Sequence, residues 1–165
     1  MMRRWLGCLA MAWLLLTAGP AQALCTAICV CNVTTTALAF GAINPLAASA
    51  SDSTGSVKVN CGGVAGLLIP YRIDLGAGAS GNASSRRLMS GARSMQYNLY
   101  QDSSRQTVWG DGNGVAQALN GGVLLDALGL SPGVVHPVYG RVPGAQSTTV
   151  PGSYADTVTV TLSYF

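Results

Sequence analysis

The final ten residues, 156–165, constrain the fold most, because their apolar and polar side chains alternate strictly. A period of two predicts a β-strand with one buried and one exposed face. Residues 157–165 contain no charged side chain and no proline, which commonly protect an exposed sheet edge. Because the sequence ends with this strand, we expect either that an earlier strand covers it or that it forms an open edge where another chain pairs. The predicted buried face consists of Val158, Val160, Leu162 and Tyr164, and the polar face of Thr157, Thr159, Thr161 and Ser163.

The N-terminus predicts a secretory signal peptide in residues 1–23. Two arginines precede a thirteen-residue apolar stretch, and Ala21-Gln22-Ala23 fits a small-x-small cleavage pattern. The apolar stretch is shorter than the roughly 20 residues that span a bilayer, which disfavours the alternative of a membrane anchor. We therefore expect an exported mature chain, residues 24–165, that forms a single domain.

The charge of the predicted mature chain argues against nucleic-acid binding. Seven basic and six acidic side chains remain after cleavage, all six acids are aspartate, and Lys58 is the only lysine. The net charge is only +1 and the basic residues do not cluster, whereas a nucleic-acid-binding surface carries a patch of lysine and arginine. We therefore expect no nucleic-acid partner.

Four cysteines remain in the mature chain, and an even number in an exported protein predicts disulfides. Of the three possible pairings we favour Cys31–Cys61 with Cys25–Cys29, since a Cys29–Cys31 bridge would close a strained, very small ring. A bridge between Cys31 and Cys61 closes a loop of about 30 residues, which contributes roughly 3–4 kcal/mol in the chain-entropy description. The alternative, a thiolate metal site, is disfavoured because no histidine lies near and the compartment is oxidising.

The spacing of turns predicts one all-β domain, a sandwich or a barrel. Turns containing glycine recur every 8–15 residues, and no segment shows a sustained helical period. Residues 51–55 are expected to form a turn, Pro70 suggests an edge strand or a bulge, and residues 123–128 are ambiguous between strand and short helix. The predicted strands are residues 30–40, 56–61, 67–75, 87–89, 95–100, 134–142 and 156–165.

Three motifs that could carry chemistry have plainer explanations. Residues 76–81 match the G-x-G-x-x-G fingerprint of dinucleotide binding, but no apolar helix follows, so we expect a flexible loop. Asp111-Gly112-Asn113 resembles half of a calcium loop, yet the closing glutamate is missing and a tight turn is favoured. His136 is the only histidine and lacks a nucleophile motif, so a structural role is favoured over a catalytic one. We accordingly predict no enzyme, no metal site and no small-molecule cofactor.

A series of short motifs runs through the mature chain in a fixed order. They are Cys31, Leu38-Ala-Phe40-Gly41, Asn44-Pro45, Gly55-Ser-Val-Lys-Val-Asn-Cys61, Tyr71-Arg-Ile-Asp-Leu-Gly76, Arg87-Leu-Met89, Tyr97-Asn-Leu-Tyr100-Gln-Asp102, Trp109-Gly-Asp-Gly112, Tyr139-Gly-Arg141 and Gly152-Ser-Tyr154-Ala-Asp156. In their order and spacing these motifs resemble the spore coat protein U domain, which occurs in subunits of Csu-type (archaic) chaperone–usher pili.

This resemblance implies an incomplete immunoglobulin-like β-sandwich, of the pilin type, that lacks its last strand. A periplasmic chaperone would lend a strand during transport, and at an outer-membrane usher the next pilus subunit would replace it. The protein would pass through the periplasm and reach the cell surface in a fimbrium. The resemblance also implies a Cys31–Cys61 disulfide between the first two strands, with Cys25 and Cys29 outside the family pattern. The chaperone-docking and donor-strand groove would include Val158, Val160, Leu162 and Tyr164, with the Phe165 carboxylate against basic residues of the chaperone.

The segment before Cys31 departs from the family pattern. Only seven residues separate the predicted cleavage site from Cys31, and at roughly 3.3 Å per residue they span about 23 Å. This is short for a donor strand, so we expect a subunit that accepts a strand without giving one, at a fibre tip or cap, with an adhesion or biofilm role. The alternative is a free-standing secreted lectin-like module that uses an aromatic surface, although packing is the favoured role of the aromatic side chains. The candidate aromatic residues are Tyr97, Tyr100, Trp109, Tyr139, Tyr154 and Tyr164.

Overall fold

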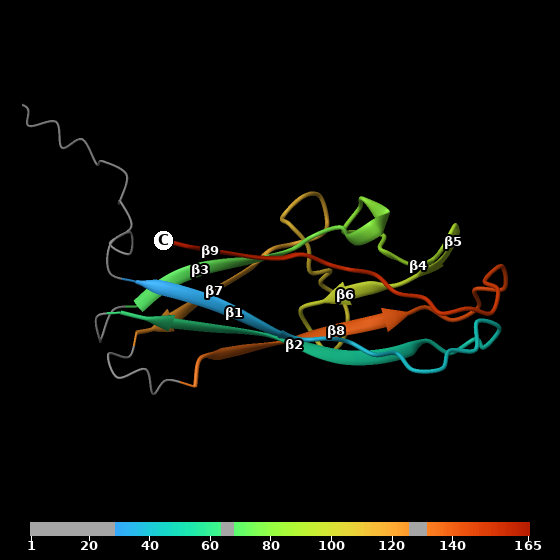
Figure 1. Ribbon diagram of the computed structural model, residues 1–165, viewed down its shortest axis with the longest axis horizontal. Helices are drawn as coiled ribbons and strands as arrows, with labels where there is room; N and C mark the ends of the chain where they lie inside the picture. Colours follow the sequence, from blue (N-terminus) through green and yellow to red (C-terminus); the bar gives the residue numbers. More distant parts are fainter. Residues whose placement is uncertain (1–28, 64–67, 126–131) are drawn as a thin grey trace, which may run out of the picture.

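The computed structural model describes residues 29–63, 68–125 and 132–165. Within these ranges the protein is almost entirely antiparallel β-structure, arranged as an elongated sandwich (Figure 1). One sheet has the strand order β1-β2-β8-β6, the other has the order β7-β3-β9, and β4 and β5 form a separate hairpin. The strands are β1 (Val30–Thr36), β2 (Ser51–Gly62), β3 (Leu68–Leu75), β4 (Arg87–Ser90), β5 (Arg93–Gln96), β6 (Asn98–Tyr100), β7 (Leu119–Leu124), β8 (Val134–Val142) and β9 (Val160–Tyr164).

The predicted fold class, an incomplete β-sandwich, is confirmed. β1 and β9 are edge strands of the two sheets, and among the described residues no hydrogen-bonded ladder joins them. A 3₁₀ turn, η2 (Gly78–Ser80), is the one helical element described, so no helix in the described ranges is long and apolar enough to cross a membrane. The predicted signal peptide, residues 1–23, and Cys25 lie outside the described residues.

The core lies between the two sheets and follows from alternation in the longer strands. In β2, β3 and β8 every second residue is buried or half-buried, as a period of two requires. Val59, Ile73 and Trp109 have no exposed surface at all. The indole Nε1 of Trp109 donates a hydrogen bond of 3.1 Å to the Ile73 carbonyl oxygen, which satisfies the polar edge of this buried ring.

The turn predicted at residues 51–55 is wrong, because this segment is the first part of β2. Ser51 pairs with Val142 and Gly55 with Val138, so residues 51–55 extend the ladder with β8. Asp52 serves as a cross-strand partner here, since its carboxylate accepts two hydrogen bonds of 2.8 Å from Arg141. The Ser, Asp, Thr and Gly residues of segment 51–55, which are typical of turns, thus lie in a strand that pairs with β8.

Two expectations about strand interruptions also need correction. β3 is the central strand of its sheet, although Pro70 suggested an edge strand. The ladder between β3 and β9 ends at Tyr164. Beyond it the carbonyl oxygen of Pro70 accepts a hydrogen bond of 3.1 Å from the Phe165 amide. The strand predicted at residues 95–100 is broken at Tyr97, whose amide donates to the Arg86 carbonyl oxygen at 3.1 Å. The chain thereby passes from the β4–β5 hairpin into the large sheet.

The bounds of several strands differ from the predicted ones. β1 ends at Thr36, short of the predicted end at Phe40, and residues 37–40 follow the strand. β7 ends at Leu124, so a strand occupies the start of the ambiguous segment 123–128, and residues 126–128 lie outside the described residues. The closing strand is shorter than the predicted 156–165, because β9 begins only at Val160. Residues 149–159 instead form an extended lead into β9 that runs past the β4–β5 hairpin (Figure 1).

Candidate functional site: an open groove between two edge strands

A groove of about 880 Å³ opens along one side of the sandwich. One wall is residues 35–43, the end of β1 and the chain after it. The other lies within residues 149–160, the chain that leads into β9 and the first residue of that strand. Core side chains form its floor, and apolar groups dominate the floor because they belong to the interior of the sandwich. The floor includes Val57, Leu75, Leu88, Met95, Leu99 and Val138.

The backbone of β9 pairs with β3 on one side, and among the described residues it has no ladder partner on the other. The Gly76 amide donates to the Thr159 carbonyl oxygen at 2.8 Å, and the Phe165 amide donates to the Pro70 carbonyl oxygen at 3.1 Å. In an antiparallel ladder every second residue faces the same neighbour, so the odd-numbered residues from 159 to 165 direct their N–H and C=O groups to β3. The N–H and C=O groups of the even-numbered residues from 158 to 164 therefore point away from β3, to the open side of the sheet.

The predicted groove residues divide into two groups in the structure. Val158 and Val160 line the groove, and together with Leu162 they are half-buried and pack against the core. Tyr164 is 37% exposed and Phe165 is 54% exposed, and neither lines the groove. The apolar face of the C-terminal segment is thus in contact with the core at its beginning and more exposed at its end.

The first wall is seated on two glycines of the large sheet. A Cβ atom at Gly55 would lie 2.5 Å from the Thr36 carbonyl oxygen and 3.0 Å from Leu38 Cδ1. A Cβ atom at Gly140 would lie 2.5 Å from Leu38 Cδ2 and 2.8 Å from Phe40 Cζ. Glycine at both positions therefore lets the chain after β1 approach the sheet closely.

The second wall is held by Ala155 and Asp156. Ala155 exchanges two backbone hydrogen bonds with Met89 of β4, at 2.7 and 3.0 Å. The Asp156 carboxylate accepts hydrogen bonds from the Tyr97 hydroxyl at 2.7 Å and from the backbone amides of Ala79 and Thr157 at 2.8 Å each. The sequence motifs included Tyr97 and Asp156, but no pattern of spacing indicated that they would meet.

A buried arginine fixes the loop on which this wall rests. The Arg86 guanidinium has no exposed surface and donates to the carbonyl oxygens of Leu75, Gly76 and Ala83 and to Asn98 Oδ1, at 2.8–3.0 Å. Burial lowers the pKa of Arg86, and the nearby Tyr97 hydroxyl and Asp156 oppose that effect. The pKa of Tyr97 is raised mainly by burial and also by the hydrogen bond to Asp156. Nothing in the sequence distinguished Arg86 from the neighbouring Arg87, which is exposed.

The predicted Cys31–Cys61 disulfide is confirmed. The two residues are directly opposite in the β1–β2 ladder and their Cα atoms are 4.0 Å apart. The bridge ties the edge strand β1 to the large sheet and thereby anchors the first wall. Cys29 is also disulfide-bonded, and Cys25, its predicted partner, lies outside the described residues.

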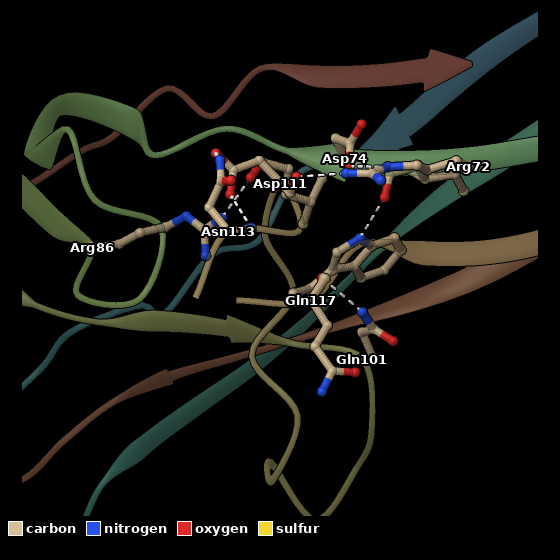
Figure 2. A network of polar contacts seen from close by, with 10 residues as sticks. Arg72, Asp74, Arg86, Gln101, Asp111, Asn113 and Gln117 are labelled. Atoms are coloured by element: carbon tan, nitrogen blue, oxygen red, sulfur yellow. Dashed lines mark hydrogen bonds and ion pairs between the residues drawn. The ribbon is translucent and has the colours of Figure 1, made fainter. Parts of the chain in front are cut away.

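The turn at Asp111 uses its own polar groups. Asp111 Oδ1 accepts the Asn113 amide at 3.1 Å, and Asp111 Oδ2 accepts the Asn113 side-chain amide at 2.9 Å. Figure 2 shows this turn beside Arg72, which donates to the Asp111 carbonyl oxygen at 2.6 Å and to Asp74 at 2.8 Å. The oxygens of the half calcium loop are therefore engaged in a tight turn.

His136 lies among aromatic rings on the inner side of β8. Its Nε2 is 2.6 Å from the hydroxyl of the buried Tyr71, and its ring packs in T-shaped contacts with the Tyr71 and Trp109 rings. Burial lowers the pKa of His136. The described part of the chain contains no group of three His, Cys, Asp or Glu side chains able to hold a metal ion. The surroundings of His136 are those of a packed core residue.

The family model of the Spore Coat Protein U domain matches residues 17–161. The chain belongs to this family. A solved structure with the same fold is the chaperone–tip adhesion subunit pre-assembly complex, CsuC–CsuE, from the archaic chaperone-usher Csu pili of Acinetobacter baumannii. The TM-score is 0.50 at 22% sequence identity, over 82% of this spore coat protein U domain chain and 39% of that chain. The chain therefore spans well under half the length of that chain, and it matches none of the curated proteins with which it was compared.

Proposed function

We propose that this spore coat protein U domain protein is a structural subunit of a chaperone–usher surface fibre, which receives a strand from another chain in the groove beside β9. The observation that carries the proposal is that, in the described part of the chain, unpaired backbone groups and an open apolar groove lie side by side. The even-numbered residues of the 158–164 segment have backbone groups without a ladder partner among the described residues, and an apolar groove opens beside them. One extended strand would pair with the backbone groups and fill the groove.

An incoming strand would bind by the same period of two that built β9. Its backbone would pair with Val158, Val160 and Leu162, while every second side chain would enter the groove. Between Tyr154 and Val160, the last residue that lines the groove, there is room for about three or four such side chains at roughly 7 Å spacing. Each apolar side chain that is fully buried contributes about 1.5–3 kcal/mol. Occupation of the groove would therefore dominate the stability of the subunit.

The proposed partners follow from this mode of binding. In transit a periplasmic chaperone would supply the strand, and at an outer-membrane usher another pilus subunit would replace it. The solved CsuC–CsuE complex supports the first step, since it is a pre-assembly complex of a chaperone and a tip adhesion subunit. Export through the predicted signal peptide would bring the chain to the periplasm and then to the cell surface.

The position at a fibre tip or cap, with a role in adhesion or biofilm formation, is a finer proposal with its own test. The purified protein is mixed with a pilin whose groove is empty. If this subunit only accepts strands, its N-terminus stays out of the partner's groove, and cross-linking of that N-terminus into the groove would contradict the tip position. The lectin-like alternative has less support, because Tyr97 and Trp109, two of its candidate aromatic residues, are buried.

The test of the main proposal uses the mature chain, residues 24–165, exported to a bacterial periplasm so that disulfides form. Two peptides of equal composition are compared, both flanked by lysines. One has five Thr-Val repeats, and the other has five threonines followed by five valines. We expect the alternating peptide to raise the melting temperature by mass action and the block peptide to have no such effect. Equal responses to both peptides would contradict the proposal.

A further inference from the structure

We infer that Asp156 is a positioning residue, which holds the β9-side wall of the empty groove in the shape that receives a donor strand. This inference rests on the proposed function. Asp156 uses both carboxylate oxygens, with Oδ2 accepting the Tyr97 hydroxyl at 2.7 Å and Oδ1 accepting the Ala79 amide at 2.8 Å. Oδ1 also accepts the Thr157 amide at 2.8 Å, which fixes the orientation of the carboxylate.

Few backbone hydrogen bonds hold this wall, and its apolar packing rests mainly on Tyr154 and Val158, which are half-buried against the core. Residues 149–159 precede β9, and Pro151, Gly152 and Ser153 are exposed. In the described structure the backbone of this lead pairs with the rest of the fold at Ala155, through Met89, and at Thr159, through Gly76. Asp156 lies between these two points and adds the side-chain contacts.

Tyr97 contacts both walls. Its ring packs against the Phe40 ring of the first wall, with the ring centroids 6.1 Å apart and an angle of 72° between the ring planes. Its hydroxyl reaches Asp156 of the second wall. Tyr97 is 6% exposed and lines the groove. Because it contacts both walls, it fixes how far apart they lie.

The η2 loop forms a platform under Asp156. Gly78 has a φ of +64°, and a Cβ atom there would collide with the Asp156 carboxylate, so glycine is required by both backbone and space. Arg86 holds the ends of the same loop through the carbonyl oxygens of Gly76 and Ala83. Arg86 thus fixes the η2 loop, the loop binds the Asp156 carboxylate, and Asp156 holds the wall.

The consequence is kinetic. While the groove is empty, the wall depends on Asp156 for its shape. After a donor strand has paired along residues 158–164, the new ladder holds the wall. Loss of Asp156 therefore leaves fewer molecules ready to bind and slows association, whereas dissociation of a paired strand is little affected.

The test measures association and dissociation rates of the alternating Thr-Val peptide on the mature chain by surface plasmon resonance. Asp156→Ala removes all the contacts of the carboxylate, and Tyr97→Phe removes one hydroxyl and keeps the ring. Tyr139→Phe is the matched control, because Tyr139 is a half-exposed residue of β8 that does not line the groove. We expect association to slow roughly threefold to tenfold in Asp156→Ala and Tyr97→Phe, as for the net loss of one ordinary hydrogen bond, with dissociation and the Tyr139→Phe rates unchanged.

The inference would be overturned if association rates were unchanged in both groove variants, or if affinity fell only through faster dissociation. In either case, binding of the alternating peptide by wild-type protein would still support the proposed function. Wild-type protein that binds neither peptide would overturn both. If Asp156→Ala does not fold, Tyr97→Phe decides the question alone, because it leaves the packing against Phe40 in place.

Discussion

Leu38 lies directly over Gly140 of β8, so that a Cβ atom at Gly140 would come within 2.5 Å of Leu38 Cδ2. The contact seats the first wall of the groove on the floor of the sandwich. Neighbouring Phe40 fits the same hollow, since that Cβ atom would also lie 2.8 Å from Phe40 Cζ. The shape of the groove therefore depends on the absence of a single methyl group.

Gly140→Ala should displace this wall. Insertion of a methyl group into packed space costs about 1–3 kcal/mol, so we expect a lower unfolding midpoint in urea and weaker binding of the alternating peptide. Gly62→Ala is the matched control, because a Cβ atom there meets nothing within 4 Å. An equal effect of the two substitutions would show that Leu38 is not seated as described.

Loss of the Cys31–Cys61 disulfide should destabilise the protein strongly. The bridge spans 30 residues of sequence, and removing such a cross-link costs roughly 3–4 kcal/mol in the chain-entropy description. The double variant Cys31→Ser, Cys61→Ser is compared with wild-type protein by urea unfolding in the presence of saturating alternating peptide. A midpoint equal to that of wild-type protein would mean that the β1–β2 ladder alone anchors the first wall.

A charge on the apolar face of β9 should abolish strand binding. Val160→Asp places an unpaired carboxylate against the core, which costs several kcal/mol, and we expect no detectable binding of the alternating peptide. Ser163→Asp is the control, because Ser163 lies opposite Arg72 on the other face and the new charge meets a cation. Retained binding by Val160→Asp would contradict the orientation of β9.

The stability of the protein should fall in mild acid because of His136. Burial holds the pKa of His136 below its ordinary value of 6.5 in the folded state. Below pH 6.5 the unfolded chain therefore takes up a proton that the folded chain does not, so the stabilisation is complete above pH 6.5 and declines as the pH falls towards the folded pKa. The hydrogen bonds from Arg141 lower the pKa of Asp52, so its stabilisation is lost only below pH 3.8 and does not contribute to the change in mild acid.

The measurement is the urea midpoint between pH 7.5 and pH 5.0. The wild-type midpoint should drop over this range, and that of His136→Gln should drop less, because glutamine retains an acceptor for the Tyr71 hydroxyl but does not titrate. Parallel curves for the two proteins would assign the acid sensitivity to other groups.

Strong alternation made much of the fold predictable from sequence. The strand at residues 134–142 has the predicted bounds, and the Cys31–Cys61 bridge joins the predicted residues. Local rules failed where tertiary contacts override them. The turn residues at 51–55 pair with β8, since Gly55 leaves room for Leu38 and Asp52 meets Arg141.

The support of the groove could not be predicted, for a physical reason. Asp156 contacts Tyr97 and Ala79 across 59 and 77 residues of sequence, and Arg86 donates mainly to backbone carbonyl groups. Such contacts depend on the path of the chain and leave no periodic pattern. The sequence indicated an apolar C-terminal strand without the charges or proline that protect a sheet edge, but not the side chains that support the groove beside it.

The most direct test of the central claim, that β9 has an unpaired edge, is residue-resolved amide hydrogen exchange of the mature chain. In the free protein, the amides of Val160 and Leu162 should exchange fast, while those of Thr161 and Ser163 are protected by β3. Addition of the alternating Thr-Val peptide should protect Val160 and Leu162 and leave the other two unchanged. Equal protection of all four amides in the free monomer would show that the edge is already paired and would contradict the account.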